Sequence, residues 1–363
     1  VDENSPIDIV SPYDYYYTFE SGTDKKMGAF SSTADFYFNN YKVGLTLSPI
    51  HNTHRTPQED DDFPIKLPSN PTDEEFMKIN GLPLEIGIYG SRTLGIGDIA
   101  IHYFEGYDRL FNLSGVNVYA FGPDKSFSII DIIYGYRKTK MIGVGTTLFF
   151  GNTTFRGDAA LFNTSDKNSA TDFSSRISSY QPQIYDSLHY SYPLKEKADY
   201  FQATLQLEID LPFDLKFVGQ LFTYDTLDYS SDSLPLDEDI SIPNLEISVD
   251  ELDPENIFTP GYGSSLGVLT KKAVLLSLQK TLADEQLTLS VSSLLDINSI
   301  DNSSSVPGVI FSFETSYNIK DNLYITMGYT KIKGDKNHPL GEDYRINIME
   351  DFSHVRASLK YNF

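Results

Sequence analysis

Apolar and polar side chains alternate along the last eleven residues of the chain. An extended strand sends successive side chains to opposite faces, so residues 353–363 have one apolar face and one polar, partly charged face. The apolar positions are Val355, Ala357, Leu359, Tyr361 and Phe363, and the polar positions are His354, Arg356, Ser358, Lys360 and Asn362.

The same period of two recurs along the whole chain and predicts a set of β-strands. In 201–210, for example, apolar residues at odd positions oppose Gln, Thr, Glu and Asp at even positions. The segment 134–150 is alternatively two strands with a break near Lys138 and Thr139. The thirteen predicted strands are 27–38, 41–49, 84–93, 98–107, 134–150, 153–163, 201–210, 214–225, 271–282, 287–295, 308–319, 322–333 and 353–363.

The links between these segments alternate between short and long. Tight turns on one side of the membrane and longer loops on the other are typical of outer-membrane barrels. We therefore predict a transmembrane, antiparallel outer-membrane β-barrel with short periplasmic turns and long acidic external loops. The short links are 39–40, 95–97, 151–152, 211–213, 283–284 and 320–321, and the long links are 50–83, 108–133, 164–198, 226–270, 298–307 and 334–352.

Thirteen strands are one short of the even number that bacterial single-chain barrels usually have. An ascending strand should precede residue 27, and Asp8–Phe19 is a candidate that Pro12 weakens. We predict about fourteen strands, or more if the amino terminus is truncated. Residues 1–26 then form one strand or an extension into the lumen or periplasm, and residues 27–363 form a single barrel domain.

The composition agrees with an envelope protein and excludes several functions. The 363 residues include no Cys and no Trp but 25 Tyr and 24 Phe, and Tyr is enriched at membrane interfaces. A net charge of −23 excludes nucleic acid as a partner, because phosphate binding needs clustered Lys and Arg. No signal peptide precedes Val1, so we expect a processed chain or a fragment in a Gram-negative outer membrane, surrounded by lipid and lipopolysaccharide.

The strand parity places several charged side chains on the inner face. At the middle of a bilayer an outward Arg or Lys would cost ~2–4 kcal/mol, which favours the lumen. These charges either pair across a filled interior or line a constriction that selects solutes. The candidates for lining the lumen are His102, Arg156, Asp158, Glu208, Lys216, Glu314, Arg356 and Lys360.

We expect no resident cofactor and no metal centre. The acidic loop segments 58–62, 236–240 and 248–255 are typical solvated loops, with calcium binding as a weaker alternative. His51 and His54 lie three residues apart, but Pro57 argues against the helix that would make both of them ligands.

We also expect no enzymatic activity. The chain has no Gly-x-Ser-x-Gly motif, and Ser353 beside His354 lacks a visible third catalytic partner. Catalysis at the rim, as in an outer-membrane lipase, remains the least favoured alternative.

Two stretches resemble an uncharacterised family of proteobacterial outer-membrane proteins that are often encoded beside RND or MMPL-like exporters. The first is 84–90 together with 98–108, and the second is 136–143 together with 154–162, where Arg156 and Asp158 match an Arg-x-Glu motif of the family. The resemblance implies transport of hydrophobic or amphipathic small molecules. It also implies a lipoprotein or exporter as a partner.

The sequence therefore predicts an outer-membrane channel or transporter that passes small solutes through its lumen. Tyr324 and Phe222 have inward parity, which keeps a path for apolar solutes open. The main alternative is a non-conducting scaffold whose long external loops bind a protein partner.

Overall fold

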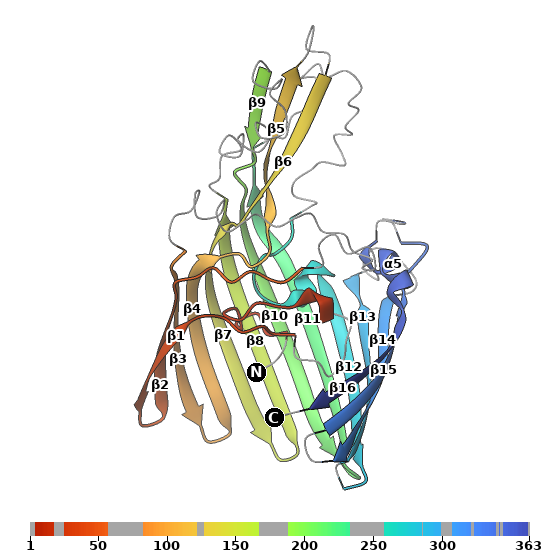
Figure 1. Ribbon diagram of the computed structural model, residues 1–363. Coiled ribbons are helices and arrows are strands. Elements are labelled where there is room, and N and C mark those ends of the chain that lie inside the picture. Colours follow the sequence, from red (N-terminus) through yellow and green to blue (C-terminus); the bar gives the residue numbers. More distant parts are fainter. Residues whose placement is uncertain are drawn as a thin grey trace.

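The chain folds into one large antiparallel sheet that curves around a concave side, as the computed structural model in Figure 1 shows. The structure describes residues 4–17, 25–56, 83–121, 127–166, 188–232, 258–284, 286–298, 307–320, 323–338, 341 and 344–361. The sheet contains, in spatial order, β1 (Ser32–Phe38), β2 (Tyr41–Ser48), β3 (Glu85–Leu94), β4 (Gly97–Tyr107), β7 (Lys138–Phe150), β8 (Thr153–Ser165), β10 (Lys197–Leu211), β11 (Leu215–Ser230), β12 (Lys272–Leu282), β13 (Leu287–Asp296), β14 (Gly308–Lys320), β15 (Leu323–Lys333) and β16 (His354–Tyr361).

Three further strands form a second sheet that projects beyond one end of the large one (Figure 1). They are β5 (Asn112–Phe121), β6 (Phe127–Gly135) and β9 (Leu188–Pro193), and most of these residues fall in the predicted long links 108–133 and 164–198. The segment 134–150 is indeed divided, but between Gly135 and Lys138 rather than after Lys138. We call the end with this second sheet the loop end and the opposite end the turn end.

The tight hairpins lie where the spacing predicted them. Asn39 and Gly151 adopt positive φ angles in two of the turns, and Phe213–Asp214 and Ala283–Asp284 each place two residues in that region. Consecutive positive φ angles fit the right-handed twist of the flanking strands. All of these hairpins lie at the turn end, as Figure 1 shows, so the alternation of short and long links is a property of the fold.

The two faces of the sheet differ as the alternation predicted. On β10, Leu205 and Leu207 are 49% and 39% exposed on the convex side, whereas Gln202 and Thr204 are buried on the concave side. The pattern repeats on β8, where Leu161 is exposed and Phe162 is buried. An apolar outer surface with a polar inner one is the reverse of a water-soluble sheet and the arrangement of a membrane barrel.

The edges of the sheet are β1 and β16, and the described pairings do not join them. Both strands run toward the turn end, since every pair across the thirteen strands is antiparallel. The all-β fold and the large antiparallel sheet are confirmed. Closure into a barrel and a count of fourteen strands remain predictions.

The prediction of a strand at Asp8–Phe19 is wrong for the described part of that segment. Residues 4–17 lie on the concave side of the sheet and contain only isolated bridges at Tyr13 and Asp14, followed by a 3-10 helix at Tyr15–Tyr17. Pro6 and Pro12 lack the amide hydrogen that a strand partner would need. Among the described residues, no helix is long and apolar enough to cross a membrane.

Candidate functional site: the inner wall and the N-terminal segment

Apolar residues fill the concave side near the loop end. One cluster gathers Phe222, Ile310 and Ile332 on the strands against Leu266 of the 3-10 helix η5 (Ser265–Val268) and Ile346 of the short helix α5 (Arg345–Ile348). A second cluster joins strand residues to the N-terminal segment and to the segment that precedes β12. Its members are Ile9, Phe104, Met141, Ala160, Phe162, Ala198, Tyr200, Phe258 and Tyr262. Inward-facing apolar residues on the strands are therefore covered by the chain's own loops.

The N-terminal segment (residues 4–17) packs into a notch in the sheet. A Cβ at Gly143 would lie 2.4 Å from Ile7 Cγ2, and one at Gly145 would lie 2.6 Å from Ile7 Cδ1. The two glycines of β7 thus leave the space that the Ile7 side chain occupies. Farther along, Asn4 donates a hydrogen bond of 2.8 Å to the Gln220 side chain on β11.

Arg109 holds the middle of the N-terminal segment. Its guanidinium binds both carboxylate oxygens of Glu85 at 3.0 and 2.7 Å and also donates to the backbone carbonyls of Ile9 and Val10. Arg109 and Glu85 are both buried. Burial alone would lower the pKa of Arg109, but nearby groups, including the Glu85 carboxylate, raise it above its ordinary value, so the guanidinium stays charged.

His54 holds the end of the same segment. Its Nδ1 accepts a 2.9 Å hydrogen bond from the backbone amide of Tyr13, and its ring makes edge contacts with the rings of Tyr13 and Tyr15. Burial, followed by the nearby cations Arg109 and Lys26, holds the pKa of His54 well below its ordinary value. The ring is therefore neutral, with its proton on Nε2, and it can act as the acceptor that the contact requires.

A buried ion cluster joins the links at the loop end. Arg137 donates to Asp108 and to Glu196, each at 2.7 Å, and to the carbonyl of Thr259 at 2.6 Å. Thr139 donates a further hydrogen bond to Asp108. Arg137, just before β7, thus contacts Asp108 after β4, Glu196 before β10 and Thr259 in the segment before β12. These contacts hold four links of the loop end together.

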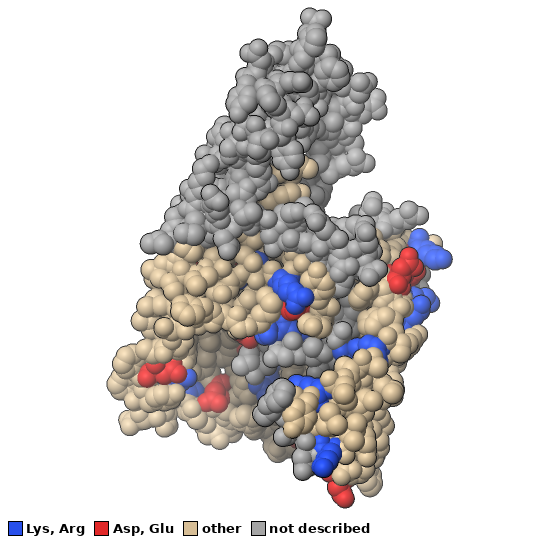
Figure 2. Space-filling model, viewed as in Figure 1, with Lys and Arg blue, Asp and Glu red and all other residues tan. Residues whose placement is uncertain are grey.

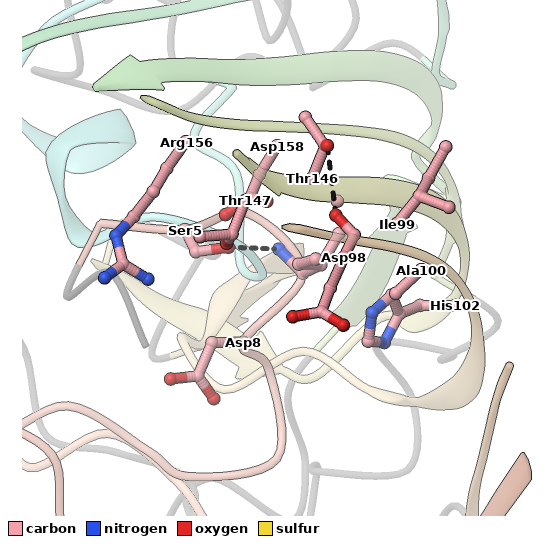
Figure 3. Close-up of a pocket in the computed structure, with 12 residues that line it drawn as sticks. Ser5, Asp8, Asp98, Ile99, Ala100, His102, Thr146, Thr147, Arg156 and Asp158 are labelled. Atoms are coloured by element: carbon pink, nitrogen blue, oxygen red, sulfur yellow. Dashed lines mark hydrogen bonds between the residues drawn. The ribbon is translucent and has the colours of Figure 1, made fainter. Parts of the chain in front are cut away.

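A pocket of about 360 Å³ lies nearer the turn end, between the N-terminal segment and strands β4, β7 and β8. Ser5 and Asp8 contribute one side, and the strands contribute Asp98, His102 and Asp158. Figure 3 shows the carboxylates of Asp8 and Asp98 pointing into the same open space, with Arg156 and His102 on opposite sides of it. The pocket is thus lined by polar and charged groups together with the apolar side chains of Ile7, Ile99 and Ala100.

The structure brings five of the eight predicted lumen residues together. His102, Arg156 and Asp158 line the pocket. Glu208 accepts hydrogen bonds from Arg156 at 2.8 Å and forms an ion pair with Lys216 at 2.9 Å, so these two join the same charged surface. In Figure 2, which shows the molecule from the side between β1 and β16, charged residues gather in the hollow between the two edges.

The other three predicted residues lie on the opposite part of the wall. Glu314 on β14 forms an ion pair with Arg356 on β16. The Arg356 side chain crosses β15 above Gly328, which leaves the space for it, because a Cβ at Gly328 would lie 2.8 Å from the Arg356 Nε atom. Lys360 lies on β16 and is exposed. Five of the eight predicted residues therefore form ion pairs within the wall.

Hydroxyl groups also line the inner wall, and they are not among the predicted site residues. Ser312 lies opposite Thr330 in the register of β14 and β15, with their side-chain oxygens 3.3 Å apart. Thr326 donates to Ser316 two inward rows closer to the turn end. The alternation contained this signal, because small hydroxyl residues recur at the inward positions of β13, β14 and β15.

The histidine and loop hypotheses have different outcomes. His51 contacts Glu85 at 3.2 Å, and its neighbour His54 accepts a backbone amide, so each ring has a role in packing. No group of three or more metal-ligating side chains occurs in the part of the chain that the structure describes. The acidic segments 58–62, 236–240 and 248–255, with their alternative as calcium sites, lie outside the described residues.

No family model and no curated protein matches the chain. Similar solved structures include the outer membrane phospholipase (OMPLA) dimer of Salmonella typhi with bound calcium, at 9% identity over 81% of this chain and 87% of that chain, with a TM-score of 0.26. Outer membrane phospholipase A from Escherichia coli is 9% identical over 81% of this chain and 86% of that chain, with the same TM-score. Pseudomonas aeruginosa OccK8 (OprE) is 12% identical over 85% and 77%, also at 0.26.

These comparisons correct one prediction. The expectation of no enzymatic activity is contradicted, because two of these similar structures are phospholipases, and we withdraw it. At a TM-score of 0.26 the likeness carries no argument for any activity of this chain. Ser353 donates to the carbonyl of Glu350, and His354 Nδ1 lies 2.9 Å from the carbonyl of Phe352, so both side chains contact backbone near the loop end.

Proposed function

We propose that the chain is an outer-membrane β-barrel through which small polar solutes pass when the N-terminal segment leaves the lumen. The observation that carries the proposal is the charged pocket on the inner wall, which the N-terminal segment covers from one side. The apolar convex surface supports a membrane location, because outward leucines such as Leu161 and Leu205 would meet lipid.

The proposal treats the N-terminal segment as a displaceable plug. It is held by polar contacts, by Ile7 in its glycine notch and by Ile9 in the second apolar cluster. Its described residues make only isolated bridges, whereas the strands behind it are held by continuous ladders of hydrogen bonds. Local opening occurs in cooperative units, so a segment outside the hydrogen-bonded ladders should move before the sheet does.

A disulfide lock tests the proposal. A Cβ at Gly143 would lie 2.4 Å from Ile7 Cγ2, which is bonded to Ile7 Cβ, so the two Cβ positions fall within the reach of a disulfide. Because the chain has no native Cys, Ile7→Cys with Gly143→Cys should form a single disulfide. In planar bilayers we expect the oxidised double variant to stay closed and to open after a reductant is added. Deletion of residues 4–17 should give the largest conductance, and each single Cys variant should not respond to the reductant.

The scaffold alternative is favoured by one observation, which is that two apolar clusters fill the concave side near the loop end. If the lumen stays sealed in every state, the reduced double variant and the deletion variant will conduct no more than the oxidised one. That result would refute the channel and leave a closed barrel whose loops bind a partner.

A further inference from the structure

Residues 258–264 form a strap that packs beside the N-terminal segment on the concave side of the sheet. Phe258 and Tyr262 of the strap are buried in the second apolar cluster, which also contains Ile9 of the N-terminal segment. The strap belongs to no helix or strand, so individual contacts hold it in place rather than a continuous ladder of backbone hydrogen bonds.

Gln202 of β10 fastens one end of the strap to the inner wall. Its side-chain amide donates to the carbonyl of Tyr262 at 2.9 Å and accepts from the backbone amide of Ser264 at 2.8 Å. Gly263, between these two residues, has a φ angle of +96°, and a Cβ there would lie 2.0 Å from Gln202 Oε1. Gln202 itself is fully buried, so this pair of hydrogen bonds is shielded from water.

The strap also supports Arg109, the residue that holds the N-terminal segment. The carbonyl of Gly261 accepts the backbone amide of Arg109 at 2.9 Å, and the ring of Tyr262 lies 5.5 Å from the guanidinium carbon. The same guanidinium donates to the carbonyls of Ile9 and Val10. A continuous series of contacts therefore runs from β10 through the strap to the N-terminal segment.

The closed position of the strap carries a local cost at Tyr262. This side chain is 2% exposed, yet its hydroxyl has no hydrogen-bond partner among the described residues. A buried hydroxyl without a partner is less stable than the same hydroxyl in water. Because an open strap would return the hydroxyl to water, this cost favours opening.

We propose that the strap is a latch that must move before the N-terminal segment leaves the lumen. When the strap moves, Arg109 loses the backbone contact and the aromatic ring that orient its guanidinium, and the segment loses its central support. Opening of the strap and release of the segment then favour each other, which is a coupling between two parts of one molecule. The inference rests on the proposed function, since it names what controls the displacement of the same segment.

Hydrogen exchange of the whole chain in detergent micelles tests the latch. In the wild type, residues 258–264 should open at least as often as residues 4–17. Gln202→Ala removes both strap contacts, so exchange should accelerate about tenfold in both segments, the effect of losing two hydrogen bonds. Asn152→Ala at the turn end also removes a side-chain amide that donates to a backbone carbonyl, and as the control it should change neither segment. A strap that opens less often than residues 4–17, or faster exchange in the strap alone, would overturn the proposal.

Tyr262→Phe tests the same latch with the opposite sign. It keeps the ring beside Arg109 but removes the hydroxyl that has no partner, so exchange at residues 4–17 should slow about fivefold. Tyr103→Phe is the matched control, because its hydroxyl donates to Glu105 at 3.0 Å, and it should leave exchange at residues 4–17 unchanged. Unchanged or faster exchange at residues 4–17 in Tyr262→Phe would also overturn the proposal.

The exchange and conduction experiments fail independently. Coupled exchange of the two segments in a protein that never conducts would refute the channel but keep the latch. A channel that opens when the disulfide lock is reduced, with an N-terminal segment that is indifferent to Gln202→Ala, would refute the latch but keep the channel.

Discussion

Lowering the pH should loosen the N-terminal segment, because His54 must be neutral to accept the amide of Tyr13. A proton on Nδ1 would replace this contact by a clash of two donors. The new charge would also be buried beside Arg109 and Lys26, with His51 close by. Asp14 lies on the same segment, but its carboxylate is engaged by Arg55 at 3.0 Å.

The sign and size of the effect follow from linkage. The docked state holds the pKa of His54 well below its ordinary value, and the released state returns it to about 6.5. The released state therefore binds more protons below about pH 6.5, and docking weakens as the pH falls. Between pH 7 and pH 5 the loss is at most about 2 kcal/mol, or roughly 25-fold in the docking equilibrium.

Hydrogen exchange at residues 4–17, corrected for the intrinsic dependence of exchange on pH, measures this loss. Wild-type protection should fall between pH 7 and pH 5, while a His54→Gln variant should show weaker protection that hardly changes. The reasoning would be refuted if the wild type and His54→Gln changed in parallel, because the change would then come from other groups.

Two further perturbations test the packing. Gly143→Ala should displace Ile7 and destabilise the docked segment by about 1–3 kcal/mol, as overpacking does, and Ile7→Ala should restore docking in the double variant. Hydrogen exchange at residues 4–17 measures both effects. Additive effects of the two substitutions would contradict a direct contact between Gly143 and Ile7. Arg137→Met should destabilise the fold by about 3–5 kcal/mol in denaturant unfolding, since it removes the cation that pairs with the buried carboxylates of Asp108 and Glu196. Lys195→Met, which breaks an exposed ion pair with Asp232, should cost less than about 1 kcal/mol. Equal losses in the two variants would contradict the buried network.

The strands could be predicted because each side chain of a strand meets one of two environments. Alternation on β8 and β10 reports this difference directly, so their existence and inward faces follow from the sequence. The second sheet was not predicted, because its strand Phe127–Gly135 does not alternate. This strand is mostly apolar and runs into the next strand without a marked turn. Periodicity alone cannot divide such a run.

The site was only partly predictable. Parity assigned Arg156 and Asp158 to the inner face, but the pocket also needs Ser5 and Asp8, which come from a segment without regular structure. Long-range contacts of such a segment leave no periodic signal. The notch for Ile7 depends on glycines of β7, and a glycine in a strand indicates close approach without naming the group that approaches.

The orientation of the sheet in the membrane is the central claim, and single tryptophans test it most directly. The chain has no Trp, so Leu205→Trp and Gln206→Trp place one fluorophore on each face of β10 without background. In vesicles that contain brominated lipid, we predict strong quenching of the Trp at 205 and little quenching of the Trp at 206. Equal quenching at both positions, or stronger quenching at 206, would contradict an apolar outer surface that faces lipid around a polar interior.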